Sequence, residues 1–485
     1  MIDVFAFNGY LVAVLGLGRS GLSAARALQE SGAEVWAWDD DPAARQRAEE
    51  LNVPLVDLNS CDWSECTTLV LSPGIPHTYP APHPIAAKAI AAKVEIICDI
   101  ELLARSQRLS SYVGITGTNG KSTTTALVGH ILSITGRQTE IGGNFGIPAL
   151  DLEPLGEGDI YVLEMSSYQL ERTVSLTFDF AVLLNISADH LERHGGMDGY
   201  IAAKKQIFRR QTYPRTAVIG IDDAFCQAIC DDLKAAGDQA VVPISGYQRA
   251  HGGVYVLNGI LIDDMEGQET AVCDLSAIPS LPGVHNWQNA AAAYATTKAI
   301  GIQPHAIMAC LQSYPGLVHR QEAVEIVDGV AFVNDSKATN ADAAARALVC
   351  YENIFWIAGG RSKAGGLKSL APHLGEVRHA FLIGEAALEL ASFLDGQVPV
   401  TLAGDIKTAV NQAYKMARDS GVAKPVVLLS PACASFDQFA NFEDRGDAFR
   451  ELVEALDGRH QDPFEEPGLF PTRKPDVTGE EMVKW

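Results

Sequence analysis

The stretch Ile115-Thr116-Gly117-Thr118-Asn119-Gly120-Lys121-Ser122 decides the fold of the middle of this chain. An apolar run over residues 112–115 predicts a buried strand, and the apolar residues that follow the stretch at helical spacing predict a helix. A strand, a glycine loop, Lys-Ser and a helix form a cradle for phosphates, because backbone N–H groups and the helix N-terminus attract anions. In such a cradle Lys121 reaches the terminal phosphates, and the Ser122 hydroxyl can bind Mg²⁺. The strict P-loop pattern requires Gly at position 115, so this loop is a variant with Ile115.

Length and composition limit what the protein can be. A chain of 485 residues with 47% hydrophobic and 20% charged residues is expected to form two to four globular domains. The formal net charge of −23, without a long Lys/Arg cluster, argues against a nucleic-acid partner. No signal-peptide pattern and no long uncharged apolar run are found, so we expect a cytoplasmic protein without a membrane span. Nine scattered cysteines suit a reducing cytosol.

Residues 1–108 alternate short strands and helices. A strand at Leu11–Leu15 leads into a G-x-G-x-x-G loop at residues 16–21, and the next strand, Glu34–Trp38, ends at Asp39. An acidic residue about 20 positions after such a loop is typical of a Rossmann-like domain that binds a nucleotide or dinucleotide. The strand Thr68–Leu71 leads into Ser72-Pro73-Gly74, at the end of the sheet where ligands bind in open α/β folds. The motif does not choose the ligand.

Residues 109–317 predict a second α/β domain around the phosphate loop. The strand at residues 160–163 delivers Glu164, and the strand at residues 180–184 leads to His190. Because both residues are expected to end strands, parallel pairing can bring them to one edge, where they can hold Mg²⁺ beside phosphates. His190 and His194 also have the spacing of a zinc protease, but Leu191 stands where that motif requires Glu, which excludes zinc hydrolysis.

Two lysines, Lys204 and Lys205, follow the His190 segment. On a helix, adjacent side chains point in different directions, so one of the two can be internal while the other is solvated. Spacing alone reads them as a surface charge pair.

Residues 318–457 predict a third, Rossmann-like domain without the dinucleotide glycines. Its strand ends carry polar clusters at residues 334–340, 359–363 and 430–435. Lysines beside hydroxyls suit an anionic substrate such as a carboxylate, although turns and helix N-caps would give the same pattern. Residues 458–485 are rich in Pro and charge and predict a weakly ordered tail. The expected fold is therefore α/β in three domains, with a P-loop-type ATPase domain between two Rossmann-like domains.

Taken together, these stretches resemble the Mur ligases of bacterial cell-wall synthesis. Residues 117–122, 164–170, 185–190 and 285–286 are similar to the central ATPase domain of that family. Residues 335–340 and 430–446 are similar to the signatures of its D-glutamate-adding member. The resemblance covers all three domains and leaves out only the tail.

The resemblance implies an ATP-dependent amide ligase of peptidoglycan precursor synthesis. ATP would phosphorylate the carboxylate of UDP-N-acetylmuramoyl-L-alanine, and the amine of D-glutamate would attack the acyl phosphate and expel phosphate. Such chemistry depends on positioning and charge neutralisation more than on covalent help from the protein. The implied cofactors are ATP, Mg²⁺ at two sites and a carbamylated lysine, and we expect a monomer.

The resemblance also assigns site residues. The implied catalytic residues are Lys121, His190 and Lys204, of which Lys204 would be carbamylated and so become a carboxylate-like ligand. The implied metal ligands are Ser122, Glu164, His190 and Lys204. The implied ATP-binding residues are Gly117, Thr118, Asn119, Gly120, Lys121, Ser122, Asn286, Arg320 and Asp335.

Two further sets concern the other substrates. The nucleotide-sugar is expected to contact Leu17, Gly18, Arg19, Ser20, Asp39, Ser72, Pro73, Gly74, Asn144 and Gln169. D-Glutamate is expected to contact Lys337, Thr339, Lys363, Ser435 and Phe442. The adjacent Lys205 leaves open which lysine is carbamylated.

Three alternatives stay open. An NAD-dependent oxidoreductase would use the first domain but leaves Lys121 and the third domain unexplained. A P-loop ATPase that acts through a partner would release phosphate without a small-molecule acceptor. A related Mur-type or folylpolyglutamate-type ligase would use another acceptor, against which residues 335–340 and the first domain argue.

Overall fold

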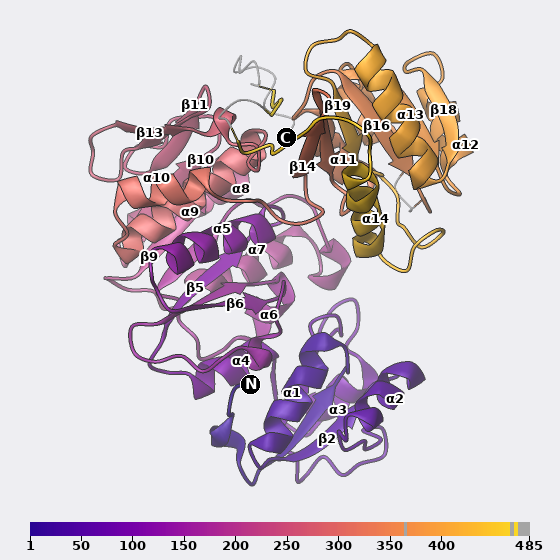
Figure 1. Ribbon diagram of the computed structural model, residues 1–485. Helices are drawn as coiled ribbons and strands as arrows, with labels where there is room; N and C mark the ends of the chain where they lie inside the picture. Colours follow the sequence, from indigo (N-terminus) through magenta and orange to yellow (C-terminus); the bar gives the residue numbers. More distant parts are fainter. Residues whose placement is uncertain (363–365, 466–469, 474–485) are drawn as a thin grey trace. The chain divides into compact units, whose positions relative to one another are not determined.

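The computed structural model describes residues 1–362, 366–465 and 470–473 (Figure 1). The described residues form two compact units. The first unit comprises Met1–Tyr255, Asp263–Thr270 and Gln288–Cys310, and the second comprises Val256–Ile262, Ala271–Trp287 and the chain from Leu311 onward. Each unit is α/β, as the sequence predicts. The three-domain boundaries drawn from the sequence stay a prediction.

The N-terminal part of the first unit is built on a four-stranded parallel sheet in the order β2-β1-β3-β4. The strands are β1 (Leu11–Leu15), β2 (Glu34–Trp38), β3 (Thr68–Leu71) and β4 (Glu95–Ile97). Alternate side chains of β1 face opposite layers of helices, so all its residues are buried. The helices are α1 (Arg19–Glu30), α2 (Pro42–Glu50), α3 (Pro84–Ala91) and α4 (Asp99–Ser106). The predicted bounds of β1, β2 and β3 are confirmed.

The central sheet carries the phosphate loop. Within the first unit its strands follow the order β11-β10-β9-β8-β5-β7-β6, and each neighbouring pair is parallel. The strands are β5 (Ser111–Thr116), β6 (Thr139–Gly143), β7 (Ile160–Glu164), β8 (Phe180–Leu183), β9 (Thr216–Gly220), β10 (Ala240–Ser245) and β11 (Val254–Leu257). Because β5 lies between β7 and β8, their carboxyl ends form one edge. The loops that follow these three strands therefore build the site.

Helices complete this layer. Buried side chains of α6 (Ser167–Arg172), α7 (Met197–Lys205) and α8 (Ala224–Ala236) join one core with β5, β7 and β8. The same core continues into α1 and α4 of the N-terminal part. The remaining helices here are α5 (Lys121–Ile134), α9 (Val284–Ile300) and α10 (Pro304–Gln312). The predicted two-residue turn at Asn258-Gly259 is confirmed between β11 and β12 (Ile260–Asp263), with both residues at positive φ.

The second unit contains a sheet in the order β18-β17-β16-β19-β15-β14-β20. The strands of this sheet are β14 (Glu322–Val327), β15 (Val330–Asn334), β16 (Ile354–Gly359), β17 (Val377–Ile383), β18 (Val400–Gly404), β19 (Val426–Leu429) and β20 (His460–Gln461). The strand β13 (Thr270–Asp274) lies outside it. α11 (Ala341–Leu348) and α12 (Ala387–Leu394) pack on one face, and α13 (Ile406–Asp419) and α14 (Phe442–Glu454) pack on the other. This two-sided cover is the Rossmann-like layering that the sequence predicts.

Part of the predicted tail is described. His460 and Gln461 pair with β14, Phe470 is buried, and the Thr472 hydroxyl donates to the carbonyl of Ser276. Residues 466–469 and 474–485 lie outside the described residues. A weakly ordered tail therefore stays a prediction for them.

Candidate active site

The phosphate loop between β5 and α5 has a backbone that only glycine fits at Gly120. Gly120 has φ 82°, and a Cβ there would lie 2.2 Å from Oδ1 of Asn289. The loop is anchored to the chain after β8, because the N–H of Asn119 donates to Oδ1 of Asn185 at 2.9 Å and the N–H of Thr118 donates to its carbonyl. The predicted phosphate cradle is therefore held in one backbone conformation at the N-terminus of α5.

Two lysines meet at this loop. Lys121 Nζ donates to the carbonyls of Gly117 and Thr118, each at 2.9 Å, and Lys204 Nζ donates to the same Gly117 carbonyl at 2.8 Å. Lys204 is 2% exposed on α7, and its burial, followed by the charge of Lys121, lowers its pKa to about 7. Lys205 is exposed and lies 3.4 Å from a carboxylate oxygen of Asp232. The internal lysine of the pair is therefore Lys204.

Glu164 ends β7 as predicted and is buried. Its Oε1 accepts a hydrogen bond of 2.7 Å from Nδ2 of Asn144, whereas its Oε2 has no partner among the described residues. A buried carboxylate oxygen without a donor is costly, so this atom fits a site for a cation. Ser122 lies in the first turn of α5, directly after the phosphate loop, and Lys204 Nζ donates to the carbonyl of Gly117 in that loop. The carboxylate of Glu164 and the hydroxyl of Ser122 are oxygen donors of the kind that Mg²⁺ prefers.

No group of three or more His, Cys, Asp and Glu side chains that could hold a metal occurs in the part of the chain that the structure describes.

His190 does not end a strand, and that expectation is wrong. β8 ends at Leu183, and His190 lies in the following loop with φ 51° and a side chain that is 52% exposed. Its ring is 5.5 Å from that of Tyr168 on α6, between ring centroids. The register of the sheet therefore fixes Glu164, whereas the loop and its contact with α6 place His190.

The two glycine-containing loops of the N-terminal sheet are packed together. The N–H of Leu17 donates to Oδ2 of Asp39 at 2.6 Å, and the Ser72 hydroxyl donates to the carbonyl of Gly16 at 2.8 Å. Gly18 caps α1, and Arg19 donates to the carbonyl of Gly146 at 2.6 Å. Of the residues predicted to contact a nucleotide-sugar, those after β1, β2 and β3 are thus brought to one place; they are Leu17, Gly18, Arg19, Ser20, Asp39, Ser72, Pro73 and Gly74.

The two other residues of that set already bond within the protein. Asn144 holds Glu164, as described above. Gln169 is fully buried, forms a capping box with Ser166 and donates to Oδ1 of Asp99 at 3.3 Å. Gln169 therefore fixes the start of α6 as it stands.

The remaining predicted residues lie in the second unit. Asp335 is buried, accepts hydrogen bonds from the Ser430 hydroxyl and the N–H of Gln321, and has its pKa raised to about 7 by burial. Lys337 Nζ lies 3.8 Å from the ring centroid of Phe442, so these two predicted D-glutamate contacts are brought together. The same unit holds Asn286, Arg320, Thr339 and the buried Ser435. Lys363 lies outside the described residues.

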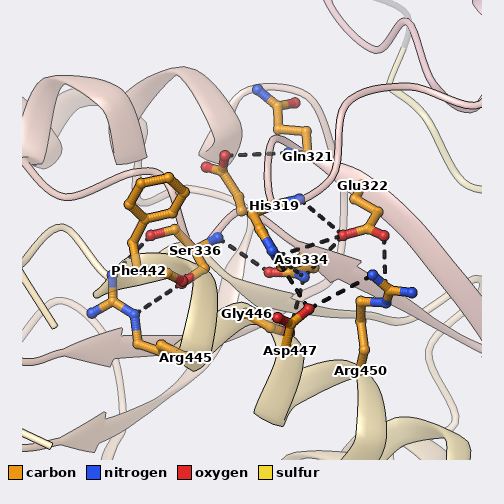
Figure 2. A network of polar contacts seen from close by, with 11 residues as sticks. His319, Gln321, Glu322, Asn334, Ser336, Phe442, Arg445, Gly446, Asp447 and Arg450 are labelled. Carbon is orange, nitrogen blue, oxygen red and sulfur yellow. Dashed lines mark hydrogen bonds and ion pairs between the residues drawn. The ribbon is translucent and has the colours of Figure 1, made fainter. Parts of the chain in front are cut away.

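A polar network holds the segment around Arg320 against α14 (Figure 2). His319, at φ 63°, has Nδ1 3.0 Å from Nδ2 of Asn334 and Nε2 3.6 Å from Asp447. Its carbonyl accepts the N–H of Lys337, and Asn334 also donates to Glu322. The network therefore ties residues 319–322 to the loop that carries Asp335 and Lys337.

Comparisons with known proteins place this geometry in a family. A model described as the Mur ligase middle domain matches residues 115–297, and one described as the Mur ligase MurD-like N-terminal domain matches residues 10–98. The UDP-N-acetylmuramoylalanine–D-glutamate ligases of Rhodospirillum rubrum and Caulobacter sp. (strain K31) are 51% and 53% identical to this chain, over 461 and 462 residues respectively. These alignments cover 94% of this chain, and 97% and 98% of the two relatives.

The chain belongs to the Mur ligase family. Solved Mur ligases share its fold at low identity. UDP-N-acetylmuramate-alanine ligase MurC from Thermotoga maritima is 16% identical with a TM-score of 0.55, covering 92% of this chain and 99% of that one. MurF ligase from the same organism, solved in complex with ADP, is 16% identical with a TM-score of 0.54, covering 94% and 99%. The predicted α/β class and the resemblance are confirmed.

The structure of this Mur ligase adds site residues that the sequence left unassigned. Asn185 holds the phosphate loop, and His194 lies 3.0 Å from the Ser167 hydroxyl and 2.8 Å from Oε1 of Glu171, stacked on Tyr168. Asn185 follows a predicted strand, so its position was a usable signal. The partners of His194 come from α6, 23 and 27 residues away, and no local pattern points to them.

No helix in the described ranges is both long and apolar enough to cross a membrane.

Proposed function

We propose that this Mur ligase is an ATP-dependent enzyme that joins D-glutamate to UDP-N-acetylmuramoyl-L-alanine. The observation that carries the proposal is the phosphate loop of Lys121, with the partnerless Oε2 of Glu164 at the end of the adjacent strand. That pair supplies a cradle for phosphates and a place for the accompanying cation. The names of the two relatives at 51% and 53% identity support the choice of substrates.

In this proposal the loop binds ATP and the carboxylate edge binds metal. Gly117 to Ser122 would cradle the phosphates, and Asn286, Arg320 and Asp335 would also bind ATP. Ser122, Glu164, His190 and Lys204 would hold Mg²⁺ at two sites, and the ions would neutralise charge on the phosphates during transfer. Lys121 would stabilise the same charge from the loop.

Lys204 would act as a carbamate. Its amine, when neutral, adds to carbon dioxide and loses a proton, which gives an N-carboxylate without any other reactant. The burial that lowers the pKa of Lys204 to about 7 makes the neutral amine available at physiological pH. Lys205 carries no such role, because its side chain is exposed and lies beside Asp232.

The remaining sets would hold the two other substrates. The loops after β1, β2 and β3, with Asn144 and Gln169, would hold the nucleotide-sugar, and Lys337, Thr339, Lys363, Ser435 and Phe442 would hold D-glutamate. The substrate carboxylate takes the γ-phosphoryl group and ADP leaves. The D-glutamate amine then attacks the acyl carbon and loses a proton, and phosphate departs as a far better leaving group than hydroxide. We further propose a monomer that works in the cytoplasm.

Phosphate release tests the proposal. The purified protein is given ATP, Mg²⁺ and UDP-N-acetylmuramoyl-L-alanine, with D-glutamate, L-glutamate, L-lysine or diaminopimelate as the acceptor. We expect phosphate and an amide product with D-glutamate alone, and none when the nucleotide-sugar is omitted. Phosphate release without any acceptor would support the partner-driven ATPase instead, and turnover with another amino acid would support a different ligase of the family. Saturable binding of a nicotinamide cofactor would favour the oxidoreductase.

A further inference from the structure

Arg172, the last residue of α6, is buried against a loop of the N-terminal sheet and is 1% exposed. Its Nη1 donates to the carbonyls of Leu71 and Ser72 at 3.3 and 3.1 Å, and its Nη2 donates to the carbonyl of Ile75 at 2.6 Å. Its Nε lies 3.3 Å from Nδ1 of His77. One guanidinium therefore contacts four residues of the segment 71–77, which are Leu71, Ser72, Ile75 and His77.

This arrangement is unusual for a buried cation. Buried guanidinium groups are normally paired with carboxylates, yet no ion pair of Arg172 is found among the described residues. Its acceptors are carbonyl oxygens and an imidazole nitrogen, and its burial lowers its pKa to about 10. The five donors of the planar guanidinium match a set of carbonyls spread along a loop, which an ammonium group cannot match.

The clamped segment is the one that would hold the nucleotide-sugar. The Ser72 carbonyl also accepts the N–H of Ile75, so residues 72–75 form a turn with the exposed Gly74 at its tip. On the other side the Ser72 hydroxyl donates to the carbonyl of Gly16, in the glycine loop after β1. Arg172 thus fixes the turn of residues 72–75, and this turn supports the glycine loop that follows β1.

The other end of the same helix belongs to the phosphate site. α6 begins at Ser167, three residues after Glu164 at the end of β7, and its N-cap Ser166 forms a capping box with Gln169. The six-residue helix α6 therefore connects the segment after Glu164, whose Oε2 has no partner among the described residues, to Arg172, which contacts the segment 71–77.

We propose that Arg172 is a positioning residue that sets affinity for the nucleotide-sugar by fixing the turn of residues 72–75 relative to the metal edge. This inference rests on the proposed function, because it takes the turn to be a nucleotide-sugar contact. Among the described residues, Arg172 bonds neither to the phosphate loop nor to Lys121, so its effect belongs to the nucleotide-sugar and spares ATP.

The test is a comparison of Arg172→Lys and Arg172→Met with wild type. Lysine keeps the charge but cannot bond all three carbonyls, and methionine leaves them without a donor. We expect KM for the nucleotide-sugar to rise about 10-fold in Arg172→Lys and more in Arg172→Met, while KM for ATP stays within about twofold. Titration calorimetry of the nucleotide-sugar without ATP, and of ADP alone, measures the same split without turnover.

Arg210→Ala is the matched control. Arg210 is exposed and donates to the carbonyl of Val174, two residues beyond Arg172, but among the described residues it makes no hydrogen bond to the 71–77 segment. We expect wild-type constants for it. Equal losses for ATP and the nucleotide-sugar in Arg172→Lys, or no loss for either, would overturn the inference. If the wild-type protein itself fails to bind the nucleotide-sugar, the proposed function fails first, and the two outcomes are thereby separated.

Discussion

Lys121 and Lys204 donate to the same carbonyl oxygen, that of Gly117, at 2.9 and 2.8 Å. Two ammonium groups on one acceptor repel each other, and the repulsion grows as solvent is excluded. Lys204 is the more buried of the two, and Lys121 is the second cause of its lowered pKa. The loop therefore favours loss of the charge on Lys204, which is the condition for carbamylation.

Replacing Lys204 should abolish most of the ligase activity. We expect Lys204→Ala to lower kcat by at least about 100-fold, because it removes the proposed metal ligand. The matched variant Lys205→Ala should stay within about twofold of wild type, since it removes only an exposed ion pair. Phosphate release measures both, and ¹³C NMR with labelled carbon dioxide should show a carbamate signal that Lys204→Ala loses and Lys205→Ala keeps. Full activity of Lys204→Ala with an inactive Lys205→Ala would reverse the assignment.

Glu164→Gln should raise the requirement for Mg²⁺. The substitution keeps an oxygen that can accept from Asn144 but removes the charge of the partnerless Oε2. We expect the Mg²⁺ concentration for half-maximal phosphate release to rise at least about 10-fold, with activity partly restored at high Mg²⁺. Glu157→Gln, in an exposed turn before β7, is the control and should behave as wild type. An unchanged Mg²⁺ dependence in Glu164→Gln would remove Glu164 from the metal site.

Strand ends could be predicted from the sequence because the parallel-sheet pattern is local. Leu11–Leu15, Thr68–Leu71 and Val426–Leu429 are mainly apolar runs that are followed directly by glycine or serine, and their bounds are confirmed. The strand Thr139–Gly143 was missed, because its first three residues are only partly buried and its sequence carries a glutamate and two glycines. The glycine loops directly follow such strands and Glu164 ends one, so those parts of the site could be predicted from the sequence.

The supporting contacts could not be predicted, because their partners are distant in the sequence. Arg172 contacts residues 71–77, about 100 positions earlier, and nothing in the local pattern separates it from the surface arginines. His190 was expected at a strand end, but its place depends on a loop with a positive φ and on Tyr168. Periodicity gives elements and their ends, whereas long-range polar pairing requires the fold.

Acid should destabilise the first unit through His77. Burial and the charge of Arg172 are the main causes that lower its pKa to about 4 from 6.5, and Arg193 and His194 add to them against Glu171. Between pH 6.5 and 4 the unfolded chain binds a proton that the folded protein does not, so stability falls as pH falls through this window. The slope from one such group is at most about 1.4 kcal/mol per pH unit.

His77→Asn isolates this contribution. An asparagine side chain can offer an oxygen to Arg172 in place of Nδ1 but does not titrate. Urea unfolding at pH 7, 6 and 5 should show a shallower loss of the free energy of unfolding in His77→Asn than in wild type. His285, whose pKa is also lowered to about 4 by burial, remains in both proteins and cancels in the comparison. Parallel pH dependences would show that His77 is not held neutral.

Gly446→Ala should break the network of Figure 2. A Cβ at Gly446 would lie 2.1 Å from Nδ1 of His319, and the nearby atoms are those of a buried ring held by Asn334, not of a flexible chain end. We expect the free energy of unfolding to fall by about 1–3 kcal/mol, as for other overpacked sites. Gly375→Ala, where the added Cβ meets nothing within 4 Å, is the control and should change stability little.

Because the carbonyl of His319 accepts the N–H of Lys337 and His319 precedes Arg320, Gly446→Ala should also raise KM for both ATP and D-glutamate at temperatures where it remains folded. Wild-type KM values in a destabilised Gly446→Ala would limit the network to a structural role.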